Sequence, residues 1–152
     1  DLTGPGGLPM AGLMYNAGAK QSTTGNAFYV GGRYDIASSG TKIGAEYNRG
    51  SKNWITMVPA EDDLWTSKLG TRGDVIELYV IQSLNRKAVA KKGEAFVQLG
   101  YQLFNFEYTG SNNWVGAPAK ISDLSTTNPA TAQMLQPVEK AQDIYLTFDV
   151  RF

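Results

Sequence analysis

The sequence predicts an all-β protein: an antiparallel up-and-down meander that forms a transmembrane β-barrel, or the carboxy-terminal part of one, with about six to eight strands in this chain. Three observations support this prediction. Apolar and polar residues alternate along stretches of roughly ten residues, which is typical of strands with one apolar face. The 17 glycines and the 6 Phe, 8 Tyr and 3 Trp favour strands joined by tight turns. Short and long connections also alternate along the chain.

The composition excludes several classes of function. The chain has 152 residues, which is one domain, and 14 basic residues balance 14 acidic ones, so we expect no nucleic-acid partner. There is no cysteine and no histidine, which removes thiol nucleophiles, histidine bases and the usual ligands of zinc, copper and haem. We therefore expect no enzymatic activity, no cofactor and no metal.

The clearest strand pattern spans Asp143 to Phe152. Side chains of a strand alternate between two faces, so one face here is wholly apolar and the other is polar and mostly charged. The apolar row consists of Ile144, Leu146, Phe148, Val150 and Phe152. A soluble β-sandwich would bury this row in its core, whereas a membrane barrel would turn it towards lipid and keep the polar row in a wet lumen.

Five earlier stretches of the single domain, residues 1–152, are also predicted to be strands. They span residues 8–15, 26–36, 41–48, 74–84 and 94–108, and residues 1–7 before them are turn-forming and loose. From Phe104 to Tyr108 the aromatic residues change parity, which predicts a bulge or an aromatic girdle. Residues 50–72 contain either two more strands, at 53–58 and 64–69, or one long loop.

The connections between these stretches alternate in length. Residues 50–72 and 109–141 are long, whereas residues 37–40 and 85–92 are short. In an antiparallel meander the long connections would gather at one rim, as they do in outer-membrane barrels. Six strands are too few to close such a barrel, for which about eight is the small end. Either residues 50–72 supply two more strands, or the chain is part of a larger barrel.

Polar residues at alternate strand positions are expected to face the lumen. The predicted lumen residues are Arg33, Asp35, Lys42, Glu46, Glu77, Gln98, Gln102, Asp149 and Arg151. Their mixed charges would either set ion selectivity in a wet pore or satisfy one another inside a narrow, closed barrel. The pattern leaves both alternatives open.

Four segments carry a resemblance to a known family. They are Lys42–Trp54, Asp63–Asp74, Leu99–Gly110 and Leu146–Phe152, and the fragment Lys68–Asp74, Lys-Leu-Gly-Thr-Arg-Gly-Asp, is the most distinctive. Together they resemble the carboxy-terminal region of a porin-like outer-membrane β-barrel family of unknown function, found in Gram-negative metal and sulfur reducers. The resemblance implies a longer intact protein and insertion by the barrel-assembly machinery. The implied assembly signal in the last strand comprises Tyr145, Phe148, Val150 and Phe152.

Two functions remain as hypotheses. The first is a porin-like protein of the cell outer membrane that gives small hydrophilic solutes or ions passive passage. Its partners would be the lipid bilayer, the barrel-assembly machinery, the solutes and further copies of itself in a homo-oligomer. The second is a soluble or surface-attached β-sandwich or small β-barrel that acts as a binding or self-assembling structural module through its long loops or open strand edges.

Overall fold

The structure is a computed structural model that describes residues 22–56, 67–84, 93–111, 118–124 and 137–151. Its strands are β1 (Ala27–Ile36), β2 (Thr41–Gly50), β3 (Gly73–Ser83), β4 (Glu94–Phe106) and β5 (Lys140–Arg151), and its 3-10 helices are η2 (Lys68–Gly70) and η3 (Ile121–Asp123). Within these ranges, no helix has both the length and the apolar character that crossing a membrane as a helix requires.

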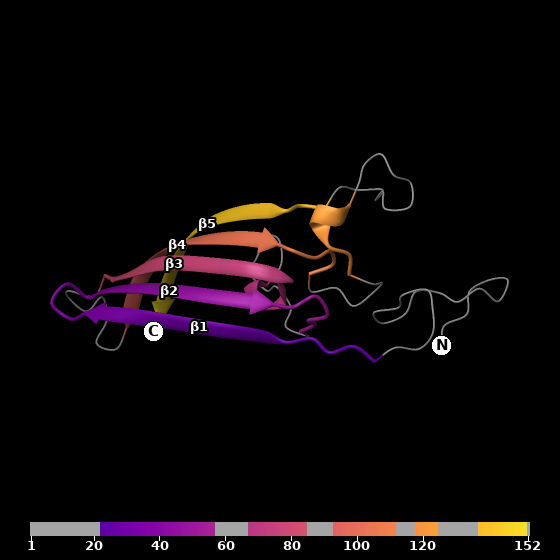
Figure 1. The fold of residues 1–152 in the computed structure, drawn as a ribbon. Helices are drawn as coiled ribbons and strands as arrows, with labels where there is room; N and C mark the ends of the chain where they lie inside the picture. The colour runs from indigo at the N-terminus through magenta and orange to yellow at the C-terminus, as the bar shows by residue number, and fades with distance from the viewer. Residues whose placement is uncertain (1–21, 57–66, 85–92, 112–117, 125–136, 152) are drawn as a thin grey trace.

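The strands form one antiparallel meander. Each strand pairs with the next one along the chain, which gives the order β1-β2-β3-β4-β5. Figure 1 shows them side by side, from indigo β1 to yellow β5. The predicted all-β antiparallel meander is confirmed. Over the described residues the sheet has five strands and is open, with β1 and β5 at its edges, and the strand predicted at residues 8–15 lies outside these ranges.

The two ends of the sheet differ in their connections. The turn at residues 37–40 and the connection between β3 and β4 lie at one end, and the longer connections after β2 and β4 lie at the other. The tight turn closes through Gly40, whose amide donates to the Ile36 carbonyl at 3.0 Å and whose φ of 68° favours glycine. The predicted gathering of the long connections at one rim therefore follows from the observed topology.

The described parts of residues 50–72 contain no strand beyond the end of β2. Residues 51–56 form turns and coil, and the chain returns at residue 67 through η2, where Ser67 Oγ accepts a hydrogen bond from the Leu69 amide at 3.3 Å. The alternative of two extra strands is therefore wrong for residues 53–56 and 67–69. The rest of those two segments lies outside the described residues.

The change of parity after Leu103 is not a bulge. β3 and β4 pair without interruption, from Ser83 opposite Phe96 to Gly73 opposite Phe106. Phe104 therefore keeps the normal alternation, and it is buried in a small core instead of facing outward in a girdle. This core consists of Val75, Phe104 and Ala141, with Phe106 stacked on Phe104 at 5.7 Å between ring centroids.

The two faces of the sheet differ in chemistry. Cross-strand pairing gathers the apolar rows of all five strands on one face, which we call the apolar face. Its exposed members are Phe28, Val30, Tyr34, Ile43, Ile76, Leu78, Val80, Leu99, Ile144, Leu146, Phe148 and Val150. The opposite face, here the polar face, carries most of the charged strand residues and the small core. The large apolar rows thus lie outside the core, with Leu146 as much as 74% exposed.

Candidate functional site

All nine predicted lumen residues lie on the polar face. The register proves their common orientation, because residues directly opposite one another in neighbouring strands share a face. One row runs across three strands through Glu46, Glu77 and Gln102. The structure brings these three residues together near the middle of the sheet.

Two carboxylates face each other in this row and share one cation. Glu46 and Glu77 are directly opposite on β2 and β3, an arrangement that is unfavourable for two like charges by themselves. Lys68 of η2 places its ammonium between them and forms an ion pair with each. The same ammonium lies 5.9 Å from the centroid of the Tyr29 ring. Lys68 thus offsets the repulsion between the two neighbouring carboxylates.

Tyr145 connects β5 to Glu77 across β4. Its hydroxyl donates a hydrogen bond to Glu77 Oε1 and accepts one from Gln98 Nε2 at 2.9 Å. The ring can cross β4 because Gly100 lies beneath it: a Cβ at Gly100 would be 2.0 Å from Tyr145 Cζ. We call Glu46, Glu77, Gln98, Gln102, Tyr145 and Lys68 the central cluster.

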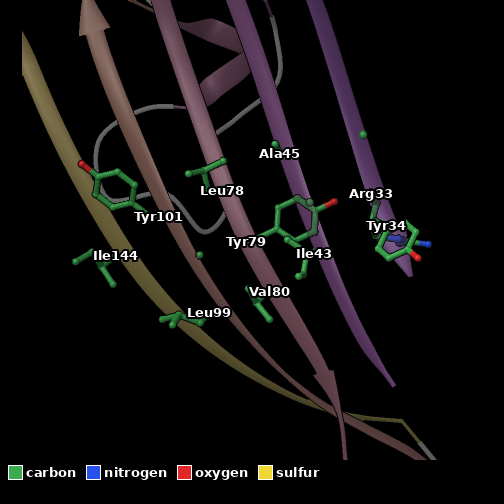
Figure 2. Close-up of a pocket in the computed structure, with 13 residues that line it drawn as sticks. Arg33, Tyr34, Ile43, Ala45, Leu78, Tyr79, Val80, Leu99, Tyr101 and Ile144 are labelled. Atoms are coloured by element: carbon green, nitrogen blue, oxygen red, sulfur yellow. The ribbon is translucent and has the colours of Figure 1, made fainter. Parts of the chain in front are cut away.

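A second tyrosine lies over a glycine in the same manner. The Tyr79 ring of β3 covers Gly44 of β2, where a Cβ would be 2.1 Å from Tyr79 Cζ. Figure 2 shows this ring reaching from β3 over β2. The register places Leu78, Val80 and Leu99 on the opposite, apolar face, where they line an open hollow. Glycines on the polar face thus allow tyrosines to lie flat across neighbouring strands.

Residues 67–72, which we call the inward segment, lie against the polar face. Asn48 Nδ2 of β2 donates a hydrogen bond to the Lys68 carbonyl at 2.6 Å, and Trp54 Nε1 donates one to the Leu69 carbonyl at 2.7 Å. Thr71 is fully buried within the segment. These bonds tie the segment both to the strand beneath it and to the preceding connection.

Arg72 anchors the end of the inward segment. It is 1% exposed, and its guanidinium donates to the carbonyls of Trp54 and Thr109, each at 2.9 Å. Burial lowers the pKa of Arg72 from its ordinary value. An arginine nevertheless remains charged at any physiological pH. Arg72 therefore joins the two long connections at the same rim.

The environment of Lys68 favours its charged form. Burial by itself lowers the pKa of Lys68, but the hydrogen bonds and ion pairs with Glu46 and Glu77 outweigh burial and raise that pKa above its ordinary value. Lys68 is therefore a permanent cation of the polar face at neutral pH.

The remaining predicted lumen residues form separate exposed pairs. Arg33 Nε lies 2.8 Å from Asp35 Oδ1, and Lys42 Nζ lies 3.9 Å from the same carboxylate. Asp149 and Arg151 pair with each other at 3.6 Å on β5, the opposite edge of the sheet. The structure does not bring these two groups together, because β3 and β4 lie between them.

A charged cluster ends the apolar face at the rim of the long connections. Arg49 contacts both oxygens of Asp74, at 2.7 and 2.8 Å, and Glu107 at 3.0 Å. Tyr47 also donates a hydrogen bond to Asp74. Charge therefore replaces the apolar rows in the last residues of β2 and in the first residues of β3.

The residues of the implied assembly signal divide between the two faces. Phe148 and Val150 are exposed on the apolar face, whereas Tyr145 belongs to the central cluster on the polar face. Phe152 lies outside the described residues. Tyr145 thus has a structural role that is independent of any signal.

Sequence reasoning missed Lys68, Arg72 and the role of Tyr145. Lys68 and Arg72 lie in the fragment that carries the family resemblance, but that resemblance assigns them no role. No described residues form a cluster of three or more His, Cys, Asp or Glu side chains that could hold a metal ion.

The geometry defines a class of protein: an antiparallel meander sheet with an exposed apolar face and a cross-linked polar face. The chain belongs to the family described as "Protein of unknown function (DUF3373)", which matches residues 6–152. No curated protein and no solved structure matches the chain.

Proposed function

We propose that this chain is part of an outer-membrane, porin-like barrel that lets small hydrophilic solutes or ions pass by diffusion. One observation carries the proposal: the apolar rows are on the uncovered face of the sheet, and most of the charged strand residues are on the other face. Leu99 is 53% exposed, Phe148 is 64% exposed and Leu146 is 74% exposed. Such values are typical of side chains that the described residues do not cover. In a membrane barrel, lipid provides that cover.

The extent of the apolar face supports the proposal. A soluble monomer rarely exposes a continuous apolar patch of more than a few hundred square ångströms. Here the exposed apolar residues run from β1 to β5, without a break between neighbouring strands. Single exposed leucines would be unremarkable in water, but rows of them across five strands need a partner surface or lipid.

The rims support the same proposal. Both long connections are at one rim of the sheet, and the shorter connections are at the other. Outer-membrane barrels have short turns on the periplasmic side and longer loops on the external side. The inward segment comes from one of the long connections and narrows the space over the polar face. A barrel built from this wall would therefore have a cross-linked lining that bears charges of both signs.

Ion conductance tests the proposal directly. The whole protein is reconstituted into planar bilayers, and stepwise current increases in KCl are expected. A protein that remains monomeric in buffer without detergent and gives no current would refute the proposal.

The open edges of β1 and β5 favour a second candidate, a soluble or surface-attached module that self-assembles. Unpaired strand edges are templates for pairing with another chain. In that case the apolar face would be covered by a second sheet, and the protein would form water-soluble oligomers without detergent. Sedimentation in detergent-free buffer distinguishes this outcome from membrane insertion.

A further inference from the structure

The central cluster carries more negative than positive charge. Glu46 and Glu77 contribute two carboxylates, whereas among the described residues Lys68 contributes the single ammonium that pairs with them. The other members are neutral. The cluster therefore has a formal charge of minus one where the inward segment approaches the sheet.

A second observation, independent of the carboxylates, is an unsatisfied acceptor. Gln102 lies directly opposite Glu77 and is 5% exposed. Its Oε1 atom is buried and has no hydrogen-bond partner among the described residues. A buried carbonyl oxygen without a donor is costly, and a cation or its hydration water would relieve that cost.

We propose that the central cluster makes the pore selective for small monovalent cations, and that Lys68 acts as a tethered counter-ion that partly neutralises this selectivity. The proposal rests on the porin-like function proposed above and names its substrate class. Lys68 already shows that the two carboxylates accept a cation between them.

The ammonium of Lys68 is a fixed part of the proposed pore lining, because the backbone that carries it is held in place. The hydrogen bonds from Asn48 to the Lys68 carbonyl and from Trp54 to the Leu69 carbonyl hold the backbone of the inward segment, and Arg72 holds its end. Removing the ammonium while keeping this backbone should therefore expose both carboxylates to permeating ions. Removing the carboxylates should leave an unbalanced lysine and favour anions.

Reversal potentials in a KCl gradient test the proposal. The whole protein in planar bilayers is expected to prefer K⁺ to Cl⁻. Lys68→Met should raise the ratio of K⁺ to Cl⁻ permeability at least about fivefold. One unit charge within a few ångströms of an ion changes that ion's local population by about that factor even in water, and loss of the ammonium favours K⁺ while it disfavours Cl⁻. Glu46→Gln combined with Glu77→Gln should lower the ratio or reverse it. Lys52→Met removes an exposed lysine outside the cluster and is the matched control.

The outcomes separate the two proposals. Absence of any current in the wild-type protein would overturn the porin-like function, and the selectivity proposal with it. Current that prefers Cl⁻, or a ratio that Lys68→Met changes no more than Lys52→Met does, would overturn the selectivity alone. Loss of β-sheet circular dichroism would show that the double glutamine variant does not fold. In that case the comparison of Lys68→Met with Lys52→Met still tests the cation selectivity.

Discussion

Replacing Leu99 with arginine tests which medium covers the apolar face. β4 has 13 residues, of which five precede Leu99 and seven follow it. At about 3.4 Å per residue the strand is roughly 40 Å long, and a tilt of about 45° reduces its height to about 29 Å. This height matches the roughly 30 Å hydrocarbon core of a bilayer. Leu99 would therefore lie close to the midplane.

The surroundings of Leu99 make the expected effect interpretable. Its cross-strand neighbours Val80 and Leu146 are 40% and 74% exposed, so a substitution removes little packing within the chain. An arginine facing lipid at the midplane should cost about 2–4 kcal/mol of unfolding free energy. An arginine on a face covered by water should change that free energy by less than about 0.5 kcal/mol.

Guanidinium unfolding of the protein folded into lipid vesicles measures this difference. Thr147→Arg is the matched control, because Thr147 is exposed on the polar face in the neighbouring strand. We expect Leu99→Arg to be destabilising and Thr147→Arg to be nearly neutral. Two equally harmless substitutions would refute the assignment of the apolar face to lipid.

Three further predictions address the polar face. Gly100→Ala should displace Tyr145 and cost about 1–3 kcal/mol in the same unfolding assay, whereas Gly32→Ala should be tolerated because a Cβ there meets no atom within 4 Å. Arg72→Met should remove charged hydrogen bonds worth about 1.5–3 kcal/mol and speed proteolytic cleavage of the long connections; unchanged cleavage would contradict its anchoring role. Folding raises the pKa of Lys68, so the ion pairs of Lys68 should contribute fully to the unfolding free energy at pH values below 10.5, its ordinary pKa. This contribution should be lost as the pH rises through the higher pKa of the folded state. Unfolding measured as a function of pH should show this alkaline loss in the wild-type protein and not in Lys68→Met.

The strands and their two faces were predictable because they depend on a local pattern. An alternation with period two fixes which residues share a face as soon as the strand is recognised. The common face of Arg33, Glu46, Gln98 and Arg151 therefore followed from the sequence and is observed. The meander followed from the short turns, since a connection such as residues 37–40 can join only antiparallel neighbours.

The central cluster was not predictable because it depends on register and on a returning loop. That Tyr145 lies over Gly100 is visible only when β4 and β5 are aligned residue by residue. Lys68 reaches Glu77 through a connection whose path leaves no periodic signal in the sequence. The bulge or aromatic girdle predicted from the parity change at Phe104 is wrong, because an aromatic residue on the polar face fills a small core while the strand pairing stays regular.

Side-chain contacts between strands hold the charged groups of the polar face in fixed positions. Tyr145 joins β5 to β3, and Lys68 joins η2 to both β2 and β3. A side chain held by two partners cannot turn away to neutralise a passing charge, so the field over the central cluster is fixed by the fold. Exposed pairs such as Arg33 and Asp35 are screened by water and contribute little to such a field. Selectivity should therefore respond to substitutions in the central cluster far more than to those at the rims.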